Sequence, residues 1–197
     1  MSLVSKLFFS LAAALVLGGG SAVLALMAQQ ETVAVSNTGW VAQPAGISDT
    51  PGPYERASIV FGDPLAPATR ELVMLTRAAD EAGNALSSAC HYTITGRPLP
   101  ATWWSVTAYG ENGQLIPNTL DKYGFNSGNV ARQSGGKFSI HLAPTPRAGD
   151  RIPTGSVSQP ISLALRLYRP DEIAQSTIAQ STAGLPDLPR VDKVSCP

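Results

Sequence analysis

The fold is decided by residues 103–116, which have the sequence WWSVTAYGENGQLI. In the first half, large apolar residues alternate with small or polar ones, as in a β-strand with one buried face. The Asn112-Gly113 dipeptide that follows is the strongest short signal for a hairpin, because both residues tolerate positive φ angles. Gln114 to Ile116 begin the returning strand, and Pro117 ends it because proline cannot donate to the ladder.

Four further segments have the character of strands, since each is bounded by turn-forming residues. They are Glu71 to Ala79, Ala89 to Thr95, Lys137 to Leu142 and Ile161 to Tyr168. The polar run between the first two predicts a hairpin. About six or seven strands with hairpin-like connections and no βαβ spacing predict an all-β fold, an antiparallel β-sandwich or jelly roll. Short helices are expected at residues 53–61 and 171–183.

The composition excludes several classes of protein. The 197 residues include 14 basic and 14 acidic side chains, so the basic surface of a nucleic-acid-binding protein is absent. The same balance of charges excludes an acidic, disordered solvating tail. The 16 prolines and 18 glycines have no repeat period and favour turns between strands over a helical bundle.

The amino-terminal region predicts a membrane segment. Leu7 to Ala28 contain no charged residue, and as a helix they would be about 33 Å long, enough to cross a bilayer core of about 30 Å. The segment is longer than the apolar region of most cleavable signals, so we favour a retained anchor over a removed signal peptide. Lys6 precedes it and no basic residue follows until Arg56. Positively charged flanks tend to stay in the cytoplasm, so this distribution predicts a single-pass inner-membrane protein with its carboxyl-terminal domain in the periplasm.

Three regions follow from this organisation. Residues 1–28 form the anchor, residues 29–68 a linker with a short helix, and residues 69–197 the β-sandwich. The linker is rich in Asn, Gly, Pro, Ser and Thr and lacks periodicity, as expected of a tether. Trp40 is the residue within it that we expect to dock on the domain.

The two cysteines, Cys90 and Cys196, are candidates for a disulfide. Thiols oxidise outside the cytoplasm, so export favours a bridge over metal binding. The bridge would fasten the carboxyl terminus, which otherwise frays. The alternative is a buried Cys90 and a free Cys196.

Signatures of catalysis and of cofactor binding are missing. Ser134 and Lys137 match the S-x-x-K motif of serine β-lactamases, but two glycines separate them and neither S-D-N nor K-T-G occurs. His91 and His141 are the only histidines, and their spacing does not fit a zinc site. We therefore assign no catalytic residue, no metal ligand and no cofactor, and the sequence favours a protein that is not an enzyme.

Polar and aromatic residues define one candidate ligand-binding face. Alternation places Trp103 and Tyr109 on the more polar side of their strand, and Arg166 and Tyr168 share one side of theirs. With Asn118, these residues have the composition of a surface that binds a carbohydrate or a small anion. The alternative is an amphipathic solvent face on which the arginine stem packs against the aromatic rings.

Several ordered motifs resemble the bacterial domain-of-unknown-function 1214 family. They are Trp103–Tyr109, Gly113–Asn118, Tyr123, Ile152-Pro153 and Leu163–Tyr168 with Pro170. The similarity covers about residues 69–190, and Cys90-His91-Tyr92 with the ending Leu188-Pro189-Arg190…Cys196-Pro197 is similar to the short, membrane-anchored members.

The resemblance implies a β-sandwich, and it implies a companion protein of the domain-of-unknown-function 1254 type, which this chain is too short to contain. It brings no established reaction and no catalytic residues. Our leading hypothesis is a membrane-anchored, non-enzymatic interaction or assembly module of the cell envelope. The alternative is a domain that binds, or an enzyme that acts on, a carbohydrate or small anion.

Overall fold

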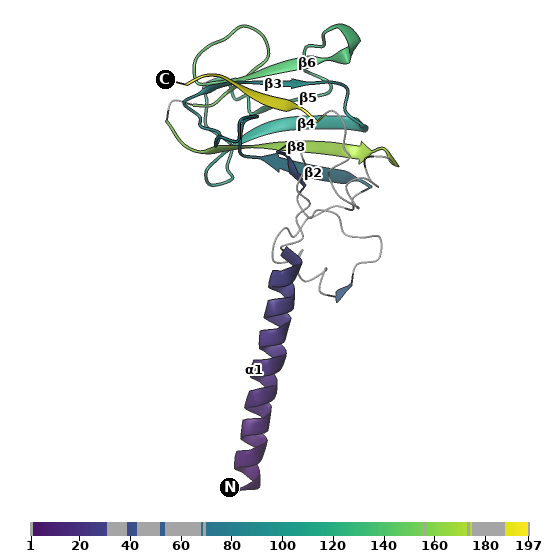
Figure 1. Ribbon diagram of the computed structural model, residues 1–197, viewed down its shortest axis with the longest axis vertical. Coiled ribbons are helices and arrows are strands. Elements are labelled where there is room, and N and C mark those ends of the chain that lie inside the picture. Colours follow the sequence, from purple (N-terminus) through teal and green to yellow (C-terminus); the bar gives the residue numbers. More distant parts are fainter. Residues whose placement is uncertain are drawn as a thin grey trace.

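The computed structural model describes residues 2–30, 39–42, 52–53, 68, 70–155, 157–172, 174 and 188–196. Beyond one amino-terminal helix, the described chain forms two β-sheets stacked as a sandwich (Figure 1). The predicted all-β sandwich is therefore confirmed. The helices expected at residues 53–61 and 171–183 lie almost entirely outside the described residues.

The helix α1 covers Leu3–Gln30 (Figure 1). Its apolar stretch Leu3–Ala25 is long enough to cross a membrane, and none of it is buried inside the protein. A membrane anchor and a signal peptide both have these properties. The helix extends beyond the predicted segment Leu7 to Ala28 at both ends, and it includes Lys6.

The larger sheet has five strands in the order β1-β2-β8-β4-β5, and all its neighbours are antiparallel. The long strands β4 and β8 lie side by side at its centre (Figure 1). The strands are β1 Val41–Ala42, β2 Leu72–Arg77, β4 Ala101–Gly110, β5 Gly124–Asn126 and β8 Ile161–Pro170.

The smaller sheet has the order β7-β6-β3-β9. Its strands are β3 His91–Gly96, β6 Phe138–Ala143, β7 Arg151–Pro153 and β9 Arg190–Ser195. The pair β6–β7 is parallel and the others are antiparallel. The expectation that every connection would be hairpin-like is therefore wrong.

The predicted hairpin over residues 71–95 is also wrong, because β2 and β3 belong to different sheets. An isolated bridge between Ala79 and Ala85 closes the turn, and the chain then crosses to the opposite layer. Both strands alternate buried and partly exposed residues. Crossing between the layers lets their two apolar faces meet in one core. The turn after β4 forms as predicted, with Tyr109 bridged to Leu115.

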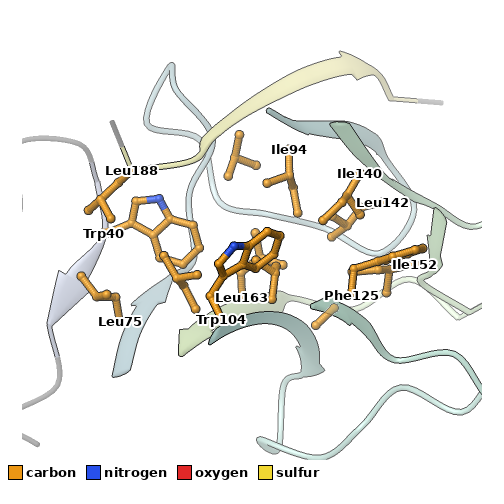
Figure 2. Close-up of a cluster of buried hydrophobic side chains, with 14 of the residues drawn as sticks. Trp40, Leu75, Ile94, Trp104, Phe125, Ile140, Leu142, Ile152, Leu163 and Leu188 are labelled. Atoms are coloured by element: carbon orange, nitrogen blue, oxygen red, sulfur yellow. The ribbon is translucent and has the colours of Figure 1, made fainter. Parts of the chain in front are cut away.

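The core between the sheets is built from the inward side chains of both layers (Figure 2). Trp104 of β4 stacks on Phe138 of β6, with ring centroids 4.5 Å apart and an interplanar angle of 30°. Phe138 in turn lies over Gly96 of β3, its partner across the smaller sheet. The aromatic pair therefore joins the two layers and covers a glycine.

Replacing Gly96 with alanine is expected to destabilise the sandwich by about 1–3 kcal/mol. The new Cβ would lie 2.3 Å from the Phe138 ring, which cannot retreat because it is stacked on Trp104. Chemical unfolding of the full chain measures the loss. In a Phe138→Ala background the same substitution should cost almost nothing, because the clash is gone. An equal cost in both backgrounds would contradict this explanation.

Trp40 anchors the segment before β1 in the sandwich. Its side chain is fully buried, and Figure 2 shows it near Leu75 and Leu188 at one end of the core. Its Nε1–H donates to the carbonyl oxygen of Pro189, at 2.7 Å. Residues 39–42, within the predicted linker, thus pack into the domain and add an edge strand to β2.

A polar network fastens the turn after β2 to the start of β9. The buried Arg77 forms an ion pair with Glu81, at 2.9 Å, and its guanidinium lies under Gly39. Glu81 also accepts a hydrogen bond from the backbone N–H of Val191. Charged and polar groups buried in this way need such partners, and here the partners connect three distant segments of the chain.

Asp80 shapes the same turn and makes stability depend on pH. Its Oδ1 accepts from the backbone N–H groups of Ala82 and Asn84, both at 2.9 Å, and Lys193 lies 3.8 Å from Oδ2. Burial acts to raise the pKa of the Asp80 carboxyl, but the hydrogen bonds from Asn84 and Ala82, with the charge of Lys193, outweigh it and hold the pKa below 3.8.

Because its pKa is lower in the folded chain, Asp80 stabilises the fold above its unfolded pKa, and this contribution is lost as the pH falls through the folded pKa. Asp80→Asn is therefore expected to destabilise the protein most at pH 7 and progressively less below about pH 4. Urea unfolding of both proteins across this range tests it. A difference that stays constant with pH would assign the effect to hydrogen-bond geometry instead of charge.

The structure contains the predicted disulfide between Cys90 and Cys196. Cys90 is buried directly before β3, and Cys196 directly follows β9. The bridge closes a sequence separation of 106 residues. It fastens β9, an edge strand whose one buried side chain is that of Val191.

Candidate functional site

The outer face of the larger sheet brings together four of the five predicted ligand-binding residues. Along β4 and β8, side chains alternate between the buried core and this face. Trp103 lies directly opposite Tyr168, and Ser105 lies opposite Arg166. We call the set Trp103, Tyr109, Arg166 and Tyr168 the aromatic face.

Trp103 and Tyr168 form an edge-to-face pair, with ring centroids 4.9 Å apart and an interplanar angle of 69°. This is a preferred geometry for aromatic rings, because the positive edge of one meets the negative face of the other. Trp103 remains 38% exposed. The pair therefore presents an oriented indole surface to solvent.

Arg166 is held in place by Tyr109. Its Nη2 donates to the tyrosine hydroxyl at 3.0 Å, and the guanidinium carbon lies 5.6 Å from the ring centroid, within the range of cation–π attraction. On β8, Ala164 lies between Arg166 and Ser162, the residue opposite Tyr109. Because Ala164 is small and buried, the side chains of Arg166 and Tyr109 can meet above it. No described carboxylate is within ion-pair distance of Arg166, so its charge is available for an anionic group.

Asn118 is placed differently from the other four residues. It lies in the loop after the β4 turn, and its amide nitrogen donates to the carbonyl oxygens of Ile116 and Lys122, at 3.1 and 3.2 Å. Its Oδ1 accepts from the backbone N–H groups of Leu120 and Lys122. The side chain thus organises its own loop, as asparagines in turns commonly do.

The neighbouring strand β2 adds residues that the sequence analysis missed. Its register places Leu72 opposite Tyr168 and Met74 opposite Arg166, and both are partly exposed. The alternation within LVMLTR shows which residues share a side of β2. It does not show that β2 lies beside β8. Leu72 and Met74 lie next to the aromatic face only because β2 pairs with β8.

The Ser134 motif does not have the geometry of a nucleophile. Ser134–Gly136 form a single 3₁₀ turn, with positive φ at Gly135 and Gly136, and Lys137 is extended before β6. The serine therefore does not begin a helix that could place Lys137 beside its hydroxyl. Within the described ranges, no group of three or more His, Cys, Asp or Glu residues could hold a metal ion.

The fold and this face define a class of protein: a two-sheet β-sandwich, preceded by an apolar helix, with an aromatic and cationic outer surface. The chain belongs to the family described as "Protein of unknown function (DUF1214)", whose model matches residues 71–172, just over half of its length. The family resemblance seen in the sequence is confirmed.

One solved structure supports the same fold. The crystal structure of the VPA0106 protein from Vibrio parahaemolyticus is similar over 70% of this chain, with 19% identity and a TM-score of 0.58. An uncharacterized protein from Burkholderia cenocepacia is similar over 64%, with 15% identity and a TM-score of 0.40. The matched regions are 34% and 29% of those proteins, so this chain spans about a third of their length. No curated protein matches it.

Proposed function

We propose that this chain is an exported, membrane-anchored β-domain that acts as a non-enzymatic interaction module of the bacterial envelope. The observation that carries the proposal is the coupling of an apolar helix to a disulfide-closed sandwich. Disulfides persist in oxidising compartments, and the amino-terminal Lys6 favours a cytoplasmic amino terminus. The sandwich then lies on the periplasmic side of the inner membrane.

The docking of Trp40 supports a position close to the membrane. Helix α1 ends at Gln30 and the docked segment begins at Gly39. A chain of this length spans at most about 30 Å even when fully extended. A retained anchor would therefore keep the domain within that distance of the helix end, where it meets other membrane-bound proteins.

Mass spectrometry of the membrane-extracted protein tests the anchor and the compartment together. We expect a mature chain that retains residues 7–28 and has Cys90 bonded to Cys196. A mature chain that begins near residue 29 would contradict the retained anchor, and two reduced cysteines would contradict export into an oxidising compartment.

A companion protein of the domain-of-unknown-function 1254 type is the partner we propose. The family resemblance suggests it. A photo-crosslinking residue at Trp103 should capture this companion. The same residue at the exposed Glu111, in the turn after β4, serves as the control. Equal, background-level products at both positions would contradict a partner at the aromatic face.

The second candidate function is binding of a carbohydrate or small anion at the aromatic face. The exposed Trp103 and the oriented Arg166 favour it, and Asn118 would contribute by shaping the loop beyond Tyr109. Trp40 and Trp104 are buried, so ligand-induced fluorescence changes would report mainly on Trp103.

Arg166→Ala is expected to abolish binding of an anionic sugar while changing the free energy of unfolding by about 1 kcal/mol or less, since the side chain is partly exposed. Titration of the full chain followed by fluorescence, with urea unfolding as the control, measures both quantities. A stable variant with unchanged affinity would refute the role of Arg166.

A further inference from the structure

The outer face of the smaller sheet, on the opposite side of the sandwich, brings two histidines close to an arginine. His91 lies on β3 and His141 on β6, and both are partly exposed. Thr93 is directly opposite His141, and His91 is two residues away on the same side of β3. Diagonal neighbours of this kind lie about 7–8 Å apart. One small ligand can therefore reach both rings.

Arg147 joins this pair from the loop between β6 and β7. Its Nη1 lies 3.5 Å from Nδ1 of His91. Since a guanidinium can only donate, Nδ1 of His91 accepts in this contact, which leaves Nε2 of His91 to face a ligand. No described carboxylate lies within ion-pair distance of Arg147, so its other N–H groups can bind a ligand.

The loop that carries Arg147 is fixed at both ends. Nη1 of Arg151 donates to the carbonyl oxygens of Ala143 and Thr145, at 3.4 and 3.3 Å. The backbone N–H of His141 donates to the carbonyl oxygen of Asp150 at 2.7 Å. The backbone N–H of Ala131 donates to the carboxylate Oδ2 of Asp150 at 2.6 Å. These contacts hold Arg147 near the histidines before any ligand arrives, which lowers the entropic cost of binding.

The neighbouring charges leave the cluster electropositive. Arg151 lies opposite His141 on β7. On β9, Asp192 lies opposite Thr93 but forms an ion pair with Arg190, at 3.7 Å. Burial and the charge of Arg147 lower the pKa of His141, and Asp150 opposes them with a smaller effect. An anion bound between these groups would offset the repulsion between Arg147 and a protonated His141, and so favour the protonated form of that ring.

We propose that His91, His141 and Arg147 form a binding site for a single oxyanion group, such as a phosphate, a sulfate or a carboxylate. Guanidinium and imidazole N–H groups are strong, directional donors to such oxygens. Thr93 supports the site, because its Oγ1 lies 3.3 Å from Nδ1 of His141. This contact fixes the orientation of the ring and leaves Nε2 for the ligand. The site is separate from the aromatic face and does not depend on the proposed function.

Sulfate is the appropriate probe, because it stays dianionic over the pH range in which histidine titrates. We expect sulfate, added to the full chain in uncharged detergent at constant ionic strength, to shift the ring resonances of His91 and His141 saturably. It should also raise the pKa of His141, whose protonated form a bound anion favours. By linkage, the apparent affinity should be about tenfold higher at pH 5.5 than at pH 7.5.

Arg147→Ala should abolish the saturable response and, without sulfate, raise the pKa of His141, since a repulsive charge is removed. The matched control is Arg97→Ala, which removes another exposed arginine and should leave the response unchanged. Unchanged backbone amide spectra would show that both variants fold. Shifts that do not saturate, or that are equal in the two variants, would overturn the proposal as general ionic screening.

The same chemistry could come from a lipid headgroup. Micelles doped with phosphatidylglycerol provide the second arm of the experiment, with phosphatidylcholine as the control lipid. Shifts that require phosphatidylglycerol and Arg147 would assign the phosphate to a membrane lipid, whereas a response to sulfate alone would assign it to a soluble ligand. A lack of any Arg147-dependent response in both arms would overturn the site.

Discussion

Replacing Trp40 with alanine is expected to lower the free energy of unfolding of the sandwich by about 3–5 kcal/mol. The substitution leaves a cavity at the end of the core where Trp40 lies between the two layers (Figure 2). It also leaves the carbonyl oxygen of Pro189 without the indole donor. Because Trp40 holds the segment that leads to α1, its loss also releases the short tether from the domain.

The matched control is Trp103→Ala, which removes the same side chain from an exposed position. We expect it to cost about 1 kcal/mol or less. Trp40→Phe should have an intermediate effect, because it keeps most of the packing but loses the hydrogen bond. Urea unfolding of the full chain, followed by near-ultraviolet circular dichroism, measures all three. Equal effects of Trp40→Ala and Trp103→Ala would contradict the structural role of Trp40.

Removal of the disulfide is expected to have a comparably large effect, about 4–5 kcal/mol, because it closes a loop of over a hundred residues in the unfolded chain. Strand β9 should be the first element affected, since Val191 is its one buried side chain. Its release would also disturb Glu81, which accepts from Val191, and Pro189, which accepts from Trp40.

The double variant Cys90→Ala/Cys196→Ser measures this effect by urea unfolding and by hydrogen exchange at the amides of β9. Exchange should accelerate most where β9 pairs with β3, and least in the central pair of β4 and β8. Reductant should bring the wild-type chain to the stability of the double variant and leave the variant itself unchanged. A wild-type chain that is insensitive to reductant would contradict the stabilising role of the bridge.

The long strands are the part of the fold that could be predicted from local sequence. Both β4 and β8 have ten residues, and along most of each strand a buried apolar side chain occurs at every second position. Such a pattern determines which side faces the core. The short strands β1, β5 and β7 have two or three residues each. A segment of that length has no measurable period, and it becomes a strand only because a longer partner lies beside it.

The two candidate sites differ in the same way. Alternation identified Trp103, Tyr109, Arg166 and Tyr168, because each lies on the outward side of a regular strand. Asn118 belongs to a loop, where no period shows the direction of a side chain, and its amide is engaged within that loop. Arg147 was not identified, because its approach to His91 depends on the course of a loop that contacts residues distant in the sequence.

The sequence by itself determined the apolar amino-terminal helix, the inward and outward sides of the long strands, and the pair of cysteines available for a bridge. These are properties of composition and of short-range periodicity. Only the tertiary structure decided which strands are neighbours, that Trp40 enters the core, and that Arg147 reaches His91. These relations depend on contacts between segments up to 149 residues apart, as between Trp40 and Pro189. Such contacts form only when both layers close on a shared core, so no single stretch of the chain encodes them.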